Sequence, residues 1–325
     1  MSTSRLPISV QINLAPSDAT VSASLLRKQI IKLYPYIHEI VLTLDTHRGK
    51  GRFAEGWLAG RERIQRILSD AILEFPSVRV QEVDYSEKGL ELVRKYFKYP
   101  PRPTRDYRGG PHYVYFYGLA SCRNDLVFHL DGDIILGGQA LSWLRMAIRA
   151  LKNPAILAVS TLPGPPSEDG ALKQEVEMED RRKLRYCFNG LSTQVFMLSR
   201  ARLSKVAFNS WAPMRFFPKA CMRGQSWYEL PEVVVSSYMK RYGLKRMDFG
   251  GHGRFFTLHI PYKSQRLFAA LPEIIERVER SLIPAEQSGF YDLHDSLFDF
   301  AEERAALARR GLRYKLSHII RKPDA

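Results

Sequence analysis

Hydrophobic residues follow two different rhythms along the first third of the chain. Strand-type apolar runs at 7–14, 39–45 and 78–84 are separated by stretches at 24–33 and 57–75 in which apolar residues recur with helical spacing. Strands that alternate with helices are typical of crossover connections, which place the strands parallel to one another. The pattern therefore predicts an α/β protein with a mostly parallel sheet flanked by helices.

Carboxylates stand where three of the predicted strands end. Asp45 and Asp84 close the second and third strands, and a further apolar run ends in Asp131-Gly132-Asp133. The carboxyl edge is where open α/β sheets bind their ligands. We therefore expect a ligand site at this edge.

The spacing of Asp131 and Asp133 indicates a cation. Residues i and i+2 of a strand point the same way, but Gly132 also allows the backbone to turn, so we expect the strand to end here. Two hard oxygen ligands at this spacing suit Mg²⁺ or Mn²⁺, which complete their shells with phosphates and water. The alternative is a polar turn that only closes a buried strand.

The rest of the chain continues the α/β pattern. Strands are predicted at 155–161, 193–198 and 253–261, and amphipathic helices at 267–282 and 291–307.

Two segments do not fit the alternation. The segment 175–185 changes from acidic to basic and is predicted to be a surface helix or a flexible flap. The stretch 99–111 holds four prolines and must be a loop. Its Arg102, Arg105 and Arg108 are candidates to contact phosphate, the alternative being a solvated linker.

The composition adds a strong positive charge to this picture. The formal net charge is +15, with 45% hydrophobic and 26% charged residues, which favours anionic partners unless the chain is simply basic. Three separated cysteines predict reduced thiols, not a disulfide framework or a zinc site. Without an apolar leader or a membrane-length apolar run, we expect a cytoplasmic protein.

One block of residues resembles the family-2 glycosyltransferases with the GT-A fold. In that family a glycine precedes the first Asp of the Asp-x-Asp pair at a fixed distance, and here Gly118 stands thirteen positions before Asp131. Cys122 takes the place of a usual alanine, and Asn124-Asp125 takes the place of Gly-Glu.

A second block resembles the acceptor side of the same family. Gly243 matches a glycine there, and counting back puts Glu232 where the family has its catalytic Asp. The pair reads Pro231-Glu232 and Tyr238 replaces an arginine, so this block departs from the pattern. The resemblance covers roughly 5–262.

The resemblance implies a set of donor-site residues. Asp45 would accept a hydrogen bond from N3–H of uracil, or else cap a helix. Asp84 would contact the nucleotide, or else start a helix, and Asp131 would contact the diphosphate through the metal. The family's arginine before the glycine is missing, and Arg102, Arg105 or Arg108 would replace it.

The resemblance also implies the catalytic base and a further metal ligand. Glu232 would act as general base, with Glu229 as the second candidate. Pro231 at a first helical turn would place Glu232 near the N-terminus of a helix, where the ionised form of the carboxylate is favoured. His259 would join Asp131 and Asp133 as a metal ligand, and His252 is its rival.

Together these features predict a metal-dependent inverting glycosyltransferase of polysaccharide biosynthesis. The donor would be a nucleoside-diphosphate sugar, with UDP favoured, and the acceptor a saccharide or a lipid-linked molecule. A GT-A-like catalytic domain is predicted over 1–262, with a nucleotide-sugar half at 1–136, an acceptor half at 137–262 and a helical basic extension at 263–325. The alternatives are a metal-dependent nucleotidyltransferase and a non-catalytic nucleic-acid binder. The nucleic-acid binder rests on the positive net charge alone, so we expect no nucleic acid as a partner.

The C-terminal tail is the most basic part of the chain. Residues 309–322 interleave six Arg or Lys residues with apolar ones. Such a tail suits an anionic membrane surface, which would hold the protein peripherally at the inner face of a membrane. A packing or oligomerisation helix is the alternative.

Overall fold

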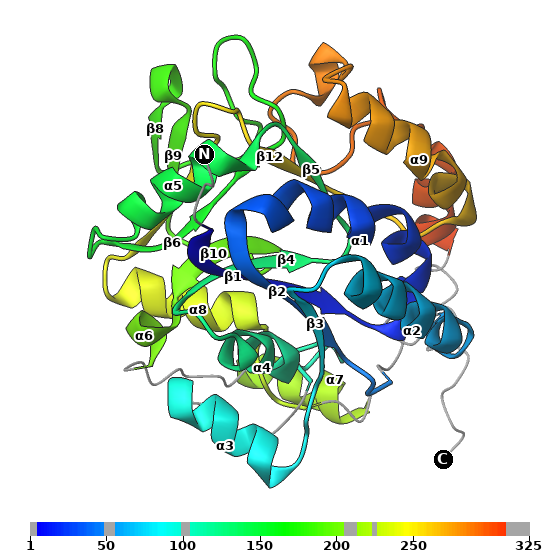
Figure 1. Ribbon diagram of the computed structural model, residues 1–325, viewed down its shortest axis with the longest axis vertical. Coiled ribbons are helices and arrows are strands. Elements are labelled where there is room, and N and C mark those ends of the chain that lie inside the picture. The colour runs from blue at the N-terminus through cyan, green and yellow to red at the C-terminus, as the bar shows by residue number, and fades with distance from the viewer. Residues whose placement is uncertain (1–4, 49–55, 99–104, 205–212, 223–225, 310–325) are drawn as a thin grey trace.

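The structure is a computed structural model, and it describes residues 5–48, 56–98, 105–204, 213–222 and 226–309 (Figure 1). The strands are β1 (Leu6–Leu14), β2 (Ile37–Leu44), β3 (Val78–Glu82), β4 (Leu126–Asp131), β5 (Ile134–Gly137), β6 (Ile156–Ser160), β7 (Leu162–Pro163), β8 (Met178–Asp180), β9 (Arg185–Phe188), β10 (Val195–Ser199), β11 (Lys245–Phe249) and β12 (Phe256–His259). The helices are α1 (Ala19–Leu33), α2 (Trp57–Glu74), α3 (Glu87–Tyr96), α4 (Tyr113–Ser121), α5 (Ala140–Ala150), α6 (Arg200–Leu203), α7 (Phe217–Met222), α8 (Pro231–Arg241) and α9 (Gln265–Glu279).

A nine-stranded sheet in the order β3-β2-β1-β4-β10-β6-β11-β9-β8 forms the centre of the protein. The first four strands in this order are parallel, which confirms the crossover units predicted from the sequence. Strand β10 is antiparallel to both β4 and β6, and β9 is antiparallel to both β11 and β8. The fold is therefore α/β as predicted, with a parallel amino-terminal half and a mixed second half.

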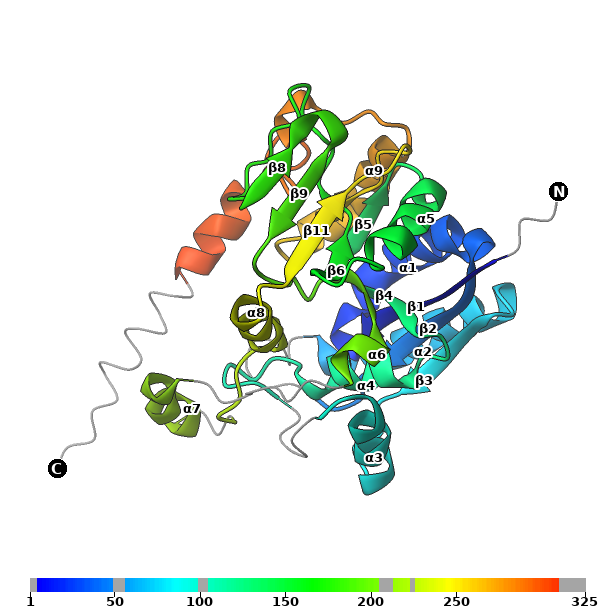
Figure 2. The ribbon, with the colours of Figure 1, turned by 90° about the vertical axis from the view of Figure 1, so that its left-hand side faces the viewer.

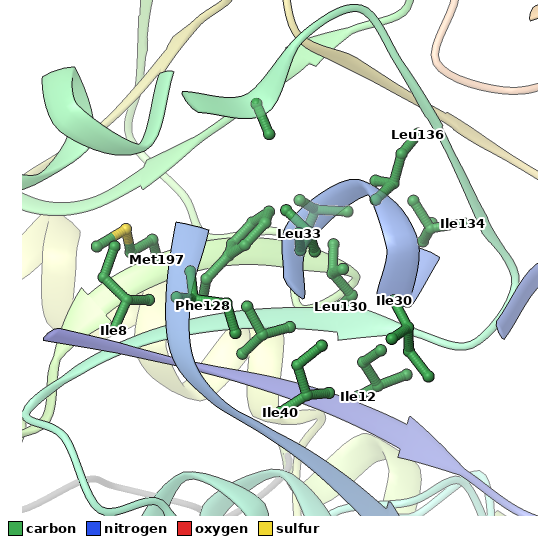
Figure 3. Close-up of a cluster of buried hydrophobic side chains, with 14 of the residues drawn as sticks. Ile8, Ile12, Ile30, Leu33, Ile40, Phe128, Leu130, Ile134, Leu136 and Met197 are labelled. Carbon is green, nitrogen blue, oxygen red and sulfur yellow. The ribbon is translucent and has the colours of Figure 1, made fainter. Parts of the chain in front are cut away.

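Strand β1 shows how the sheet separates an apolar layer from a polar one. Its even-numbered residues from Ile8 to Leu14 are buried and belong to one cluster with residues of α1, α2 and α5. Figure 3 shows Ile8 and Ile12 in this cluster with Ile30 of α1. Its odd-numbered residues Ser9 and Gln11 are equally buried but polar, and they point to the opposite face. That face is covered by α3, α4, α6 and α8. Polar side chains thus lead along β1 toward the carboxyl edge of the sheet.

A smaller sheet has the order β5-β12-β7, and Figure 2 shows its strand β5 beside α9. Helix α9 packs on it and shares a core with β12, as Leu258, Leu267 and Leu271 are all fully buried in one cluster. This sheet matters for the site because β5 begins immediately after Asp133 and β12 ends at His259.

Two sequence predictions about secondary structure are wrong. The segment 175–185 is neither a helix nor a flap, because β8 pairs with β9 as an antiparallel hairpin at the edge of the sheet. The helix predicted at 291–307 covers only 301–309 within the described residues, and residues 291–300 are irregular. Among the described helices, none combines the length and the apolar character that a membrane crossing requires.

Candidate functional site

The two carboxylates of the Asp-x-Asp pair lie on either side of a tight turn. Strand β4 ends at Asp131, and Asp133 follows in the turn before β5, as predicted. A Cβ atom on Gly132 would lie 2.7 Å from the Leu14 side chain and 3.2 Å from the Asn13 carbonyl oxygen. The turn therefore packs too closely against β1 for a larger residue to fit without a shift.

Asp131 is held by two aromatic side chains. The Tyr115 hydroxyl, from α4, donates to its Oδ2 at 3.1 Å and approaches Oδ1 at 3.3 Å. The Nε2 atom of His129 lies 3.3 Å from Oδ1, although it has no aligned hydrogen-bond partner among the described residues. Burial raises the pKa of Asp131, and His129 offsets part of that rise.

Behind Asp131 a buried polar network fixes the orientation of His129. Gln11 donates from Nε2 to Asn13 at 2.7 Å and to Thr43 at 2.8 Å, so its Oε1 faces Nδ1 of His129. The imidazole therefore carries a proton on Nδ1, and Nε2 faces the carboxylate. Nε2 of His129 and the carboxylate of Asp131 attract each other only when one proton lies between them.

Packing against this network explains the glycine thirteen residues before Asp131. A Cβ atom on Gly118 would lie 2.5 Å from Nε2 of Gln11 and 3.1 Å from the hydroxyl of Thr43. Helix α4 can approach the polar face of the sheet this closely only with glycine at that position.

Asp133 has a partner that the sequence did not indicate. The ammonium of Lys263 lies 3.4 Å from Oδ2 of Asp133 and 2.8 Å from Oδ1 of Asp18. Burial lowers the pKa of Lys263, but the two carboxylates outweigh it and the pKa is raised. A fixed positive charge therefore stands next to the Asp-x-Asp turn.

The structure brings His259 to this turn. Strand β12 pairs with β5 so that His259 lies opposite Ile134, and the next amide, of Ile260, donates to the Asp133 carbonyl at 3.3 Å. Asp131, Asp133 and His259 keep 20%, 17% and 19% of their side-chain surfaces exposed, so a ligand can reach all three. Among the described residues, no three His, Cys, Asp or Glu side chains form a ready-made metal cluster.

A carboxylate orients His259. Its Nδ1 lies 2.7 Å from Oδ1 of Asp292, a residue in the irregular segment after α9. Burial lowers the pKa of the imidazole, but Asp292 and the nearby Asp133 outweigh burial and raise it. The rival His252 is exposed beyond the other end of β12, where its backbone amide bonds to Ser142.

The carboxylate of Asp45 lies at the end of β2 and is also held on both sides. Arg105 Nη1 lies 2.9 Å from its Oδ2, while the Tyr85 hydroxyl and the His47 amide donate to Oδ1 at 2.8 and 3.0 Å. The rings of His47 and Tyr85 stack with centroids 4.1 Å apart. The structure thus unites Asp45 and Arg105, two residues selected separately from the sequence.

Asp84 has a local partner instead. Its Oδ1 accepts the backbone amide of Ser86 at 2.8 Å, just before α3, and the bonds with Ser86 lower its pKa. This is the helix-start arrangement that the sequence offered as the alternative.

The acceptor-side candidates lie at and before the start of α8. Pro231 occupies the first turn of that helix, as predicted, and Glu232 follows it. The first helical turn was expected to favour the ionised form of Glu232, but burial of its carboxylate outweighs this and raises its pKa, although the residue as a whole is exposed. The Thr193 amide and the charges of Arg246 and Arg108 offset part of this rise, and Asp131 adds to it. Glu232 is therefore within electrostatic reach of the Asp-x-Asp turn.

Glu229 and Arg108 are placed differently from Glu232. Glu229 is buried, and its Oε1 accepts the amide of Leu230 at 3.0 Å. The exposed Arg108 bonds to the Tyr107 hydroxyl at 3.2 Å, and that hydrogen bond raises its pKa. Arg102 lies outside the described residues.

Sequence reasoning missed four of these side chains, namely Tyr115, His129, Lys263 and Asp292. Only His129 carried a local signal, because it precedes Asp131 by two residues on the same strand and so shares its face. The other three reach the turn from α4 and from segments that follow β12.

No protein-family model matches the chain, and no curated protein does. Solved structures are similar to it. Glucosyl-3-phosphoglycerate synthase from Mycobacterium tuberculosis in complex with Mn²⁺, UDP and phosphoglyceric acid is 14% identical, with a TM-score of 0.39, over 83% of this chain and 76% of that one. The same enzyme with Mn²⁺, UDP-glucose and phosphoglyceric acid is 15% identical, with a TM-score of 0.38, over 85% and 80%.

Another similar structure is the galactosyltransferase LgtC with donor and acceptor sugar analogs. It is 10% identical, with a TM-score of 0.36, over 74% of this chain and 72% of that one. Because the identities of these three structures are at or below 15%, function has to follow from the residues of this chain.

Proposed function

We propose that the protein is a metal-dependent inverting glycosyltransferase that uses a nucleoside-diphosphate sugar, with UDP as the favoured nucleotide. The observation that supports this most is the turn at Asp131–Asp133, which has His259 and Lys263 beside it and the carboxylate Glu232 within electrostatic reach. The turn with His259 and Lys263 suits a diphosphate and its metal ion, and Glu232 suits an acceptor hydroxyl.

Asp131, Asp133 and His259 would hold a divalent cation. The two carboxylates suit both Mn²⁺ and Mg²⁺, and the imidazole favours the transition metal Mn²⁺ of the two. An imidazole held by a carboxylate, as Asp292 holds His259, is usual at metal sites. The cation would act as a Lewis acid on the diphosphate. Lys263 would add a second positive charge at the same place.

Asp45 would recognise the base. Its two oxygens are engaged by Arg105, Tyr85 and the His47 amide, but each carboxylate oxygen can accept more than one hydrogen bond. A uracil N3–H can therefore be added to this set. The stacked rings of His47 and Tyr85 give the base an aromatic neighbour.

Glu232 would act as the general base. The acceptor hydroxyl loses its proton to this carboxylate while its oxygen bonds to the anomeric carbon of the sugar, and the bond from that carbon to the diphosphate breaks on the opposite side. A raised pKa suits a base that must hold a proton transiently. Glu229 is the second candidate, and its bond to the Leu230 amide leaves it less free to reach an acceptor.

A thermal-shift panel of nucleotide sugars with and without Mn²⁺ tests the proposal. A ligand that binds the folded state raises the melting temperature, and we expect UDP-sugars to do so only with the metal. Turnover then separates two reaction classes. Release of UDP from a UDP-sugar supports a transferase, whereas release of pyrophosphate from a nucleoside triphosphate would indicate the nucleotidyltransferase alternative.

The acceptor is proposed to be a saccharide or a lipid-linked molecule that the protein meets at an anionic membrane surface. The six basic residues of 309–322 motivate this, and each is worth about 1 kcal/mol near such a surface. Residues 310–325 of this tail lie outside the described residues. The division of the chain into a catalytic domain at 1–262 and a basic extension at 263–325 is part of the same proposal. Co-sedimentation with anionic and neutral liposomes, comparing the wild type with a variant in which the six become Gln, tests it. Equal binding would contradict the membrane role.

A further inference from the structure

The segment 287–294, which we call the strap, is a stretch of mostly irregular backbone held in place by the buried side chain of Gln287. Gln287 is fully buried, and its amide nitrogen donates to the carbonyl oxygens of Phe290 and Asp292 at 3.1 and 3.0 Å. Its Oε1 accepts the amide of His294 at 2.8 Å. One side chain therefore holds both ends of the strap together.

The strap lies along the end of β12, next to the Asp-x-Asp turn. The amide of His259 donates to the Tyr291 carbonyl at 2.9 Å, and the amide of Leu293 donates to the His259 carbonyl at 3.0 Å. Asp292 holds the His259 ring, and the ring of Tyr291 lies parallel to it, with centroids 5.8 Å apart and an angle of 7°. Two side chains of the strap thus reach the site.

The hydroxyl of Tyr291 is buried and has no hydrogen-bond partner among the described residues. A buried polar group without a partner is costly and is uncommon in folded proteins. A tyrosine hydroxyl can donate one hydrogen bond. This hydroxyl belongs to a ring that lies parallel to the His259 ring, beside the turn at Asp131–Asp133, so it is an unused donor at the edge of the candidate site.

We propose that Tyr291 donates a hydrogen bond to an anionic oxygen of the diphosphate bound at Asp131 and Asp133, and that the strap is thereby part of the donor site. This inference rests on the proposed function. A ligand oxygen is the preferred acceptor because the carboxylates already near Tyr291 make no hydrogen bond with it.

The variant Tyr291→Phe tests this with two opposite effects. Removal of an unsatisfied hydroxyl leaves the melting temperature of the ligand-free protein unchanged or higher, since the ring still stacks on His259. Calorimetry should show UDP binding in the presence of Mn²⁺ weakened about tenfold or more, as expected for a lost hydrogen bond to a charged group. Binding of Mn²⁺ alone should not change.

Tyr186→Phe is the control. Tyr186 is fully buried, and its hydroxyl, unlike that of Tyr291, has a partner because it donates to the carbonyl of Gly170. We expect this variant to lose stability and to keep its affinity for UDP with Mn²⁺.

The outcomes separate the two proposals. If wild-type protein binds UDP with Mn²⁺ and Tyr291→Phe binds it equally well, the role of Tyr291 is overturned and the proposed function stands. Weaker binding of Mn²⁺ alone in the variant would also overturn it, because the hydroxyl would then serve a metal ligand. Failure of the wild type to bind any nucleoside diphosphate would instead overturn the proposed function.

Discussion

The carboxylates on the two sides of the candidate site are held in different ways. On the donor side, two side chains hold each carboxylate: Asp131 contacts Tyr115 and His129, and Asp45 contacts Arg105 and Tyr85 in addition to the His47 amide. On the acceptor side, the carboxylate of Glu232 accepts a backbone hydrogen bond from Thr193, and the residue is exposed.

This difference corresponds to what each carboxylate would do. A group that binds a charged diphosphate and a metal gains from being fixed before the ligand arrives, because less order is then lost on binding. A general base must be able to approach the acceptor and to exchange its proton with solvent after each turnover. The comparison therefore supports the proposed roles, which are binding for Asp131 and Asp45 and proton transfer for Glu232.

The largest expected effect separates catalysis from binding. Glu232→Gln preserves shape but removes the base, so we expect kcat to fall by about 10²–10⁴-fold while donor affinity stays unchanged. Steady-state kinetics beside donor calorimetry measures both. An active Glu232→Gln together with an inactive Glu229→Gln would move the base to Glu229, which precedes α8.

The next effect lies on the donor side. Asp292→Asn keeps the size of the residue that orients His259 but removes its charge, and we expect Mn²⁺ affinity in the presence of UDP to fall by about 10–100-fold. Asp295→Asn is a suitable control, because Asp295 pairs with Arg304 at 2.8 Å. Equal affinities in the two variants would show that His259 needs no carboxylate partner.

A pH profile sharpens the assignment of Glu232. Its pKa is raised above the ordinary value, and a general base acts only when it is deprotonated. At saturating metal, kcat/KM should therefore rise about tenfold per pH unit below that pKa and level off above it. The rise should be absent from the residual activity of Glu232→Gln. A rise that persists in the variant would assign the titration to another group.

The smallest effect concerns stability away from the site. Glu303, in the helical segment 301–309, accepts from Ser264 at 2.6 Å and from Arg266 at 2.8 Å, and these bonds lower its pKa to about 2. Its stabilisation is therefore complete above the unfolded-state pKa near 4.5 and is lost as pH falls toward 2. Glu303→Gln should cost about 1–2 kcal/mol at pH 7 and less at pH 3, with unchanged donor affinity. Chemical denaturation at both pH values measures this.

The sequence predicted those parts of the molecule that depend on neighbouring residues. The alternation in β1 and the glycine between Asp131 and Asp133 are local signals, so both the strand and the turn appear as expected. Lys263 and Asp292 could not be predicted, because they reach the turn through the pairing of β12 with β5 and through the irregular strap.

The wrong predictions have the same cause. The charges of 175–185 indicated a solvated helix or flap, but Met178 to Asp180 add to β9 by backbone hydrogen bonds that do not depend on apolar side chains. In the segment 291–300, apolar residues with helical spacing such as Leu293 and Leu297 share a core with α9 without forming a helix.

Calorimetric titration of UDP with Mn²⁺ into wild-type protein and Asp133→Ala tests the central claim most directly. The carboxylate lies in a turn at the sheet edge, so the fold should persist, which circular dichroism checks. A surface variant, Asp169→Ala, is the control. We expect the metal-dependent affinity of Asp133→Ala to fall by at least about 100-fold, since a direct ligand should cost no less than an outer-shell partner. Unchanged affinity would contradict the assignment of the turn at Asp131–Asp133 as the donor site.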